Sequence, residues 1–310
     1  MALDGGGNPT PVYPTRDMQS GLLLLERLSD ADLELLARIA AGRLERTAPA
    51  ARPRADPDRI EGLLARPEVF AALFEDAGDD PLVVAGPFLA FAVLLAHAPV
   101  LLEGLAYVHE PVGRRQRVPV FEVEPLREFV DDPLRRLFLA DLLGSYTHVA
   151  SGALWVKSRR GWRHRRFSEL DPAQFAELIL SVPPEQRLAL YRRLGDLTLF
   201  LCGVFPDHVE ERALSPVAVE RLRRAVAGGE PATTLPPGSG STAAGLGGAA
   251  FLEWLGQRAY RLAWEATGSS EFGMAGVLGD VTGRFRQARL ILNVLTDRYL
   301  FGRRERWFAA

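Results

Sequence analysis

YRRLGDLTLFLCGVFPDH, residues 191–208, is the segment around which we expect the chain to fold. Its centre, GDLTLFLCGVF, carries a single charge, Asp196. A helix that is apolar on all sides is buried in a core, so the segment predicts a core helix. An unpaired carboxylate is costly there. We therefore expect Asp196 to pair with Arg192, Arg193 or a distant arginine, or to cap a helix that begins after Gly195.

Helices are predicted on both sides of this segment. Ser29 and Asp32 form a capping signal, and Asp171-Pro172 starts a helix in the same way. Near the C-terminus, apolar residues recur at threes and fours, which predicts a helix whose apolar face is covered by the main core or by a second chain. These residues are Phe285, Ala288, Leu292, Leu295 and Tyr299.

The stretch 81–102 has no formal charge and is long enough to span a bilayer. Pro87 and Pro99 bracket its most helical part, which leaves about a dozen residues between them. Proline is tolerated in a first helical turn and disrupts a helix interior. A segment of that length is more typical of a buried helix than of a membrane span.

We predict a mainly α fold, a multi-helix globular bundle with one or two small β-hairpins. The chain has 310 residues, 47% of them hydrophobic and 25% charged, as in ordinary soluble proteins. We expect a disordered tail (1–20), a main helical domain (21–227) with a hairpin near 153–167, a Gly/Pro-rich linker (228–250), and C-terminal helices (251–310) that dock on the main domain. Short strands are also expected at 107–109 and 118–123.

The segment ALWVKSRRGWRHRRF predicts a hairpin with Arg160-Gly161 at its turn. Residues 151–170 carry six cations and one acid, whereas residues 1–100 carry a net charge of -6. Arginine forks suit phosphates and carboxylates, and tryptophans can stack on bases. We predict binding of an acidic protein, a nucleic acid or an acidic lipid surface through Lys157, Arg159, Arg160, Trp162, Arg163, Arg165 and Arg166. The alternative is a solvated hairpin whose charges prevent edge-to-edge pairing.

Two further hypotheses stay open. Helices at 125–131 and 133–147, followed by a hairpin, resemble the helix-and-wing order of winged helix-turn-helix regulators, although the second helix looks too apolar to reach base edges. A hydrolase could instead use dispersed groups such as Asp196, His148 and His208, with Glu110 as a further candidate. Structural pairing of Asp196 is the simpler interpretation, because structural ion pairs also bury acids.

Composition excludes several classes of protein. Lys157 is the only lysine and Cys202 the only cysteine, which removes internal disulfides, multi-cysteine zinc sites and most lysine-dependent enzymes. The P-loop, G-x-S-x-G and H-E-x-x-H motifs are missing. The N-terminus does not resemble a signal peptide. We expect a cytoplasmic protein, more a binding or adaptor protein than an enzyme, with no catalytic residues, metal or cofactor. Self-association through the C-terminal helices is a further expectation.

The element GDLTLFLCGVFP, at 195–206, resembles a GDxxLFxxGxFP element in a family of mainly helical bacterial proteins. The segments PVFEVEPLREFV and LLGSYTHV are similar to that family as well, so the resemblance covers about residues 85–300. It implies a mainly helical bacterial protein and brings no activity or site residues with it.

Overall fold

Helix α10 (Leu188–Val204) forms the centre of the molecule, as its apolar composition predicts. α13 (Gly248–Ala266) runs along it, and α15 (Phe285–Leu295) packs against it near Gly203. Every residue of α10 from Leu197 onwards is buried. Such a helix is stabilised by packing on all its sides rather than by its own propensity.

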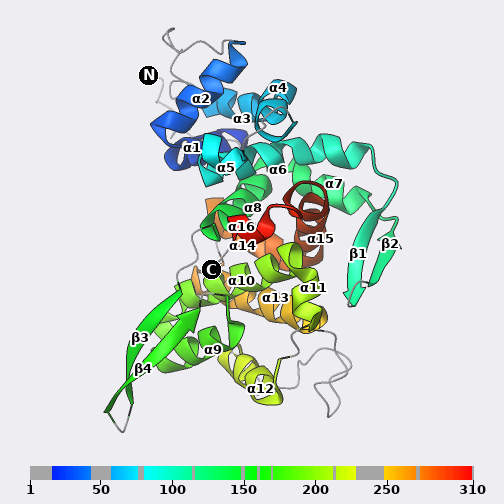
Figure 1. The fold of residues 1–310 in the computed structure, drawn as a ribbon. Helices are drawn as coiled ribbons and strands as arrows, with labels where there is room; N and C mark the ends of the chain where they lie inside the picture. Colours follow the sequence, from blue (N-terminus) through cyan, green and yellow to red (C-terminus); the bar gives the residue numbers. More distant parts are fainter. Residues whose placement is uncertain are drawn as a thin grey trace, which may run out of the picture.

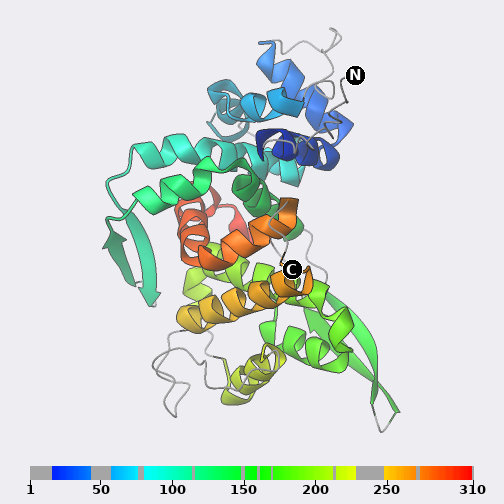
Figure 2. The ribbon, with the colours of Figure 1, turned by 180° about the vertical axis from the view of Figure 1, so that it is seen from behind.

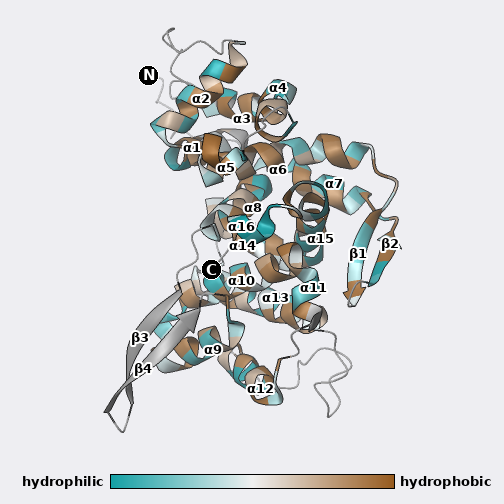
Figure 3. Ribbon diagram, viewed as in Figure 1, coloured by the Kyte–Doolittle hydropathy of each residue, from teal (hydrophilic) through white to brown (hydrophobic). Residues whose placement is uncertain are grey.

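The computed structural model confirms a mainly α fold, with two small antiparallel hairpins in the described part of the chain (Figure 1). Hydrophobic and hydrophilic residues alternate around most helices, as amphipathic helices require (Figure 3). The described residues are 16–42, 57–75, 80–113, 116–147, 151–158, 161–168, 170–211, 214–227, 248–269 and 273–308. The shorter elements and connecting helices include α4 (Pro67–Phe70), η2 (Ala71–Glu75), α5 (Pro81–Val84), α7 (Glu124–Asp131), α9 (Pro172–Ser181), η3 (Pro184–Gln186), α11 (Pro206–Glu211), α12 (Pro216–Ala225), α14 (Gly273–Gly283) and η4 (Thr296–Leu300).

Glycines determine how closely α13 and α15 approach α10. Gly195 lies against the ring of Tyr260 in α13, and a Cβ atom at Gly203 would lie 2.6 Å from the Cβ atom of Leu292 in α15. A side chain does not fit at such a distance unless the helices move apart. Glycine costs about 1 kcal/mol relative to alanine inside a helix, and the close packing that it permits offsets that cost.

Two polar side chains bind the C-terminal end of α10. The Nδ2 atom of Asn293 donates to the carbonyl oxygens of Cys202 (2.9 Å) and Gly203 (2.8 Å), and the hydroxyl of Thr296 donates to the latter at 3.3 Å. The last carbonyls of a helix have no partner within the helix. α15 and the residue after it therefore satisfy groups that would otherwise be buried without hydrogen bonds.

Helix α6 (Pro87–Glu103) is the second buried helix, and it is longer than predicted. The expectation that Pro99 ends it is wrong, because Pro99 lies inside the helix. An interior proline costs about 3 kcal/mol, but burying a leucine contributes roughly 1.5–3 kcal/mol. Leu101 and Leu102, beyond the proline, are both buried, so their packing balances or exceeds the cost of Pro99. Within the described ranges, no helix has both the length and the apolar character needed to cross a bilayer.

The N-terminal helices α1 (Arg16–Arg27), α2 (Asp30–Ala40) and α3 (Pro57–Leu64) pack above α6 in Figure 1. The predicted cap of α2 is confirmed: Ser29 Oγ accepts from the backbone N–H of Asp32 (3.1 Å), and the Asp32 carboxylate accepts from that of Ser29 (3.2 Å). Asp32 also accepts from the N–H of Gly86 at 2.8 Å. The cap of α2 therefore also holds the chain that enters α6.

Helices occupy parts of two segments that the sequence predicts to be irregular. α1 begins at Arg16, inside the predicted tail (1–20), because Ser20 is buried and its hydroxyl donates to Glu61 of α3. α13 begins at Gly248, inside the predicted linker (228–250), and Gly248 lies against the backbone carbonyl of Val209. The rest of these two segments, residues 1–15 and 228–247, lies outside the described residues.

Two hairpins extend from opposite sides of the helical body, and both views agree on this (Figures 1 and 2). One is β1 (Val108–Gly113) paired with β2 (Gln116–Val120), and the other is β3 (Ser151–Ser158) paired with β4 (Gly161–Ser168). β1 packs on α15 and α11, whereas contacts of β3 and β4 with the helices are sparse. The first hairpin is thus held against the body by β1, whereas the second projects from it with few contacts.

The apolar face predicted near the C-terminus is buried within the chain itself: Phe285, Ala288, Leu292 and Leu295 in α15 are at most 1% exposed. After it, α16 (Arg304–Trp307) brings Trp307 and Phe308 between α6 and α10. The Phe308 ring stacks on Phe91 of α6 and meets Phe200 of α10 edge to face. The C-terminal residues therefore complete the core between the two buried helices.

Candidate functional site

The predicted binding residues lie on the hairpin formed by residues 151–168, which we call the arginine-rich hairpin. Its register places Lys157 opposite Trp162, Val156 opposite Arg163, Leu154 opposite Arg165 and Ala153 opposite Arg166. Gly161 pairs with Ser158 as the first residue of β4, so the prediction that Gly161 lies in the turn is wrong, and Arg160 lies outside the described residues. The structure therefore brings Lys157, Trp162, Arg163, Arg165 and Arg166 onto one ladder, and Arg159 and Arg160 lie outside the described residues.

The pleat of the ladder sorts these positions into two faces, because successive residues of a strand alternate between faces. Positions 155 and 157 lie on the same face of the ladder, and position 155 pairs with position 164. One face therefore holds positions 153, 155, 157, 162, 164 and 166, which are Ala, Trp, Lys, Trp, His and Arg. The other holds positions 154, 156, 163 and 165, which are Leu, Val, Arg and Arg.

Helix α8 (Pro133–Ser145), the helix compared above with a recognition helix, is buried among α6, α1, α14 and α7. Its two arginines face inwards. Arg135 is 8% exposed and donates to Asp280 (2.6 Å) and to the carbonyl of Glu128 (2.9 Å). Arg136 donates to the carbonyl of Val130 at 2.6 Å. A helix packed in this way does not offer a polar face to a nucleic-acid groove.

Asp196 bridges α10 and α13. The hydroxyl of Tyr260 donates to its carboxylate at 2.8 Å, and Arg192 lies 3.9 Å away on the same helix. Burial raises the pKa of Asp196 above its ordinary value, and this effect outweighs Arg192, the Tyr260 hydrogen bond and Arg193, which all lower it. Asp196 is therefore paired within the core, as the simpler interpretation of the sequence expects.

The structure does not bring His208 of the hydrolase hypothesis to Asp196. His208 lies exposed on α11, beyond the end of α10, whose eight residues after Asp196 alone span about 12 Å. His148 lies outside the described residues. Cys202 is a buried thiol in α10. Across the described ranges, no group of three or more His, Cys, Asp or Glu residues is placed to hold a metal ion.

Asp196→Asn is expected to raise the free energy of unfolding at pH 7, because asparagine carries no charge that burial must desolvate. The folded state binds the Asp196 proton more tightly than the unfolded chain does, so ionisation of this carboxyl costs stability at neutral pH. Stability should therefore rise as pH falls from neutral through the folded-state pKa and level off below the unfolded value of 3.8. Asparagine keeps an acceptor for Tyr260 and removes this rise. Urea unfolding across that pH range measures both effects.

Tyr260→Phe is the matched control for that substitution, because it removes only the donated hydrogen bond. It should raise the pKa of Asp196 further and steepen the pH dependence of stability. Burial would not be the dominant effect on Asp196 if the Asp196→Asn variant were less stable than the parent protein at pH 7 and its stability had the same pH dependence.

A buried ion network holds the β1–β2 hairpin on the body. Arg289 of α15, only 5% exposed, donates to Glu253 of α13 (2.8 Å) and to Glu110 of β1. Arg286 binds the same Glu110 carboxylate. Burial raises the pKa of Glu110, but the hydrogen bonds and charges of the two arginines lower it by more. The pKa of Glu110 therefore lies below its ordinary value. The sequence singled out Glu110 but not its partners, because they are more than 140 positions away.

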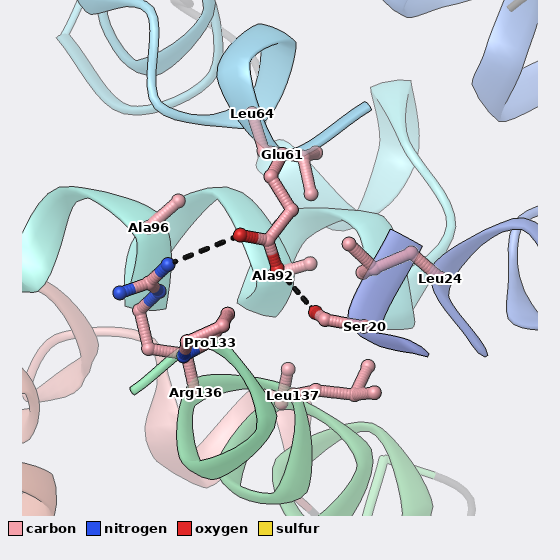
Figure 4. A pocket seen from close by; sticks show the side chains of 10 residues that line it. Ser20, Leu24, Glu61, Leu64, Ala92, Ala96, Pro133, Arg136 and Leu137 are labelled. Atoms are coloured by element: carbon pink, nitrogen blue, oxygen red, sulfur yellow. Dashed lines mark hydrogen bonds and ion pairs between the residues drawn. The ribbon is translucent and has the colours of Figure 1, made fainter. Parts of the chain in front are cut away.

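A small cavity lies among α1, α3, α6 and α8 (Figure 4). Within it, the Ser20 hydroxyl donates to one Glu61 oxygen, and Arg136 lies 3.4 Å from the other. The volume of about 20 Å³ suffices for one water-sized group. Pockets that bind small molecules measure roughly 300–1,000 Å³, so this cavity is too small for a substrate. Its lining comprises Ser20, Leu24, Glu61, Leu64, Ala92, Ala96, Pro133, Arg136, Leu137 and Ala140.

Comparison with known proteins gives no match: no protein-family model, no curated protein and no solved structure matches the chain.

Proposed function

We propose that the protein is a non-catalytic binding or adaptor protein whose arginine-rich hairpin engages an acidic partner. The observation that carries the proposal is the position of the hairpin. Its strands pair with each other, have sparse contacts with the helices, and extend away from the body (Figures 1 and 2). Edge strands left open in this way are available to a partner.

Charge supports the same proposal. The segment 151–170 has a net charge of +5 in a chain whose overall charge is -2. Arginine binds carboxylates and phosphates with two parallel hydrogen bonds, which favours anionic partners over neutral ones. The proposal places the protein in the cytoplasm, where a single cysteine stays reduced. Self-association through the C-terminal helices remains a prediction.

The two alternative hypotheses draw less support. A winged-helix regulator needs a helix with an accessible polar face, and α8 is buried with its arginines bonded internally. A hydrolase needs its acid and base within hydrogen-bond reach of a substrate. Asp196 is bonded to Tyr260 inside the core, whereas His208 is exposed on another helix.

Changing the hairpin arginines together tests the proposal. The variant with Arg159, Arg160, Arg163, Arg165 and Arg166 all replaced by serine is expected to bind polyanions at least tenfold more weakly than the parent, because each lost cation removes one anion contact. The measurement is fluorescence anisotropy of the full chain with a labelled polyglutamate peptide and a labelled single-stranded oligonucleotide, across a salt series. Circular dichroism shows whether the helical body remains folded.

The matched control removes five exposed arginines from elsewhere on the described surface. Surface ion pairs contribute about 0–1 kcal/mol each, so this variant should fold, and it has the same net charge as the hairpin variant. If the parent, hairpin and control proteins bound the polyanions equally well, the proposal would be refuted. If binding weakened equally in both variants, it would depend on net charge and not on the hairpin, which would also contradict the proposal. The control positions are Arg16, Arg27, Arg66, Arg221 and Arg224.

A further inference from the structure

The β1–β2 hairpin turns one face to the body and one face away from it. On the first face, Val108 is buried and Glu110 binds the two arginines of α15. Residues of a strand alternate between faces, so the positions next to these two point outwards. Four side chains at outward positions are exposed, and we call them the aromatic face: Tyr107, His109, Pro119 and Phe121.

Three aromatic rings form a row on this face. Tyr107 is in the middle and is 44% exposed, with its ring centroid 5.3 Å from that of His109 and 5.6 Å from that of Phe121, which is 71% exposed. The planes of Tyr107 and His109 are nearly perpendicular, at 89°, and those of Tyr107 and Phe121 cross at 50°. Rings at such angles present faces and edges together. Exposed apolar groups gathered in this way are typical of a binding surface.

The aromatic face is too small for a stable contact with a second copy of the chain. A specific protein–protein interface takes about 800 Å² from each partner. A large aromatic side chain buries roughly 150–250 Å² when it is fully covered. The side chains of this face are partly covered already, so together they offer a few hundred Å², roughly half of such an interface or less. An area of this size suits a short peptide segment.

The hairpin also limits the conformation of such a peptide. β1 lies against α15 and α11, so a strand would have to add to the edge of β2. Pro119, in β2, has no N–H to offer there, because proline in an edge strand stands where the N–H side faces solvent. An α-helix is about 10 Å wide, whereas the two strands lie only about 5 Å apart. The third common conformation of bound peptides, polyproline II, is recognised by aromatic side chains.

A polyproline II helix matches the spacing and the polarity of the aromatic face. It rises about 3.1 Å per residue with three residues per turn, so residues three apart share a side at about 9 Å, which is less than two steps along the row of rings. Its carbonyl groups have no partners within the helix, and the Tyr107 hydroxyl and the His109 ring are hydrogen-bond donors. Arg117, two positions before Pro119, is already paired with Asp297, so the face favours an uncharged ligand.

We propose that the aromatic face binds a proline-rich peptide in the polyproline II conformation, with proline rings packed on Tyr107, His109 and Phe121. This goes beyond the proposed function, because it assigns a second partner of different chemistry to a surface on the opposite side of the helical body from the arginine-rich hairpin (Figure 1). A protein with two such surfaces brings an acidic partner and a proline-rich partner together, as an adaptor does.

The experiment measures the binding of labelled peptides of about ten residues to the full chain by fluorescence anisotropy. One probe is polyproline, and the other is a threonine-rich peptide, which favours a β-strand. The test variant carries Tyr107→Ser and Phe121→Ser. The matched control carries Leu22→Ser and Val217→Ser, on α1 and α12, whose side chains are 47% and 60% exposed. Circular dichroism shows whether each variant keeps its helical body.

Aromatic residues dominate the affinity of small contact surfaces, so the test variant should bind polyproline at least tenfold more weakly than the parent. Tyr107→Phe keeps the ring and removes one donor, and it should weaken binding about two- to tenfold. The matched control should remain within about twofold of the parent. Added salt should also change the affinity of the parent by less than about twofold, because the contact includes no ion pair.

The proposal is overturned if the parent does not bind polyproline, if the threonine-rich peptide binds as tightly, or if the test variant binds polyproline like the parent. It is also overturned if the parent dimerises in sedimentation velocity while the test variant stays monomeric, because a second copy then covers the face. The five-arginine variant should bind polyproline like the parent. A loss of binding there would contradict the proposal and leave the polyanion test of the proposed function unaffected.

Discussion

Trp307→Ala is expected to lower the free energy of unfolding by about 4 kcal/mol, in the range of large aromatic truncations in cores. Trp307 is 4% exposed, and its ring meets Phe91 of α6 edge to face. Its indole Nε1 donates to the carboxylate of Asp80 at 2.7 and 2.9 Å. The substitution removes this hydrogen bond and leaves a cavity beside α6. Urea unfolding at pH 7, followed by circular dichroism, measures the change.

Two variants separate the contributions at this position. Trp307→Phe keeps a ring and removes the indole donor, so it should cost about 1.5–3 kcal/mol for the lost hydrogen bond to a charged group. Phe301→Ala is the exposed control, since Phe301 is 57% exposed, and it should change stability by less than about 0.5 kcal/mol. Equal effects of Trp307→Ala and Phe301→Ala would show that the C-terminal residues do not complete the core.

Arg289→Met is the second substitution with a large expected effect, a loss of about 3–5 kcal/mol at pH 7. It leaves Glu110 and Glu253, whose side chains are 13% and 20% exposed, without their shared buried cation. Arg286, which is 46% exposed, still binds Glu110. The loss exceeds the value of any single hydrogen bond, because partly buried carboxylates must remain charged or take up protons.

The pH dependence identifies the cause of that loss. In the parent protein, the pKa of Glu110 lies below its ordinary value. The ionised Glu110 carboxylate therefore contributes fully to stability above its unfolded-state pKa, and this contribution is lost as pH falls through the folded-state pKa. In Arg289→Met, the loss should be largest at pH 7 and smaller near pH 4, where carboxyls are protonated. Arg286→Met is the matched control, expected to cost less than about 1 kcal/mol. A loss equal at both pH values would indicate packing rather than charge.

Local patterns in the sequence predict a large part of this fold. The apolar run in 191–208 predicts α10 because burial on all sides needs no long-range information. The Ser29–Asp32 cap and the ladder of residues 151–168 likewise depend on neighbours a few positions apart. The end of α6 is different: Pro99 predicts a stop, and only the burial of the residues beyond it explains why the helix continues.

The parts that the sequence does not reveal depend on distant partners. Arg289 is one of 36 arginines, and nothing in its neighbourhood distinguishes it from those at the surface. Its partner Glu110 lies 179 positions away, and Trp307 lies 227 positions from Asp80. The candidate binding residues are a contrasting case, because a dense local charge run marks them and their common ladder follows from a short hairpin.

The same separations bear on how fast the molecule folds and unfolds. Contact between the β1–β2 hairpin and α15 closes a loop of nearly 180 residues. The chain loses conformational entropy in closing this loop before the ion network contributes any stabilising energy. Local helices form long before such a contact is made. We therefore expect the network around Arg289 to form late in folding, and interactions formed after the transition state act mainly by slowing unfolding. We therefore expect these buried charges to affect the unfolding rate, and with it the lifetime of the folded protein, more than they affect the folding rate.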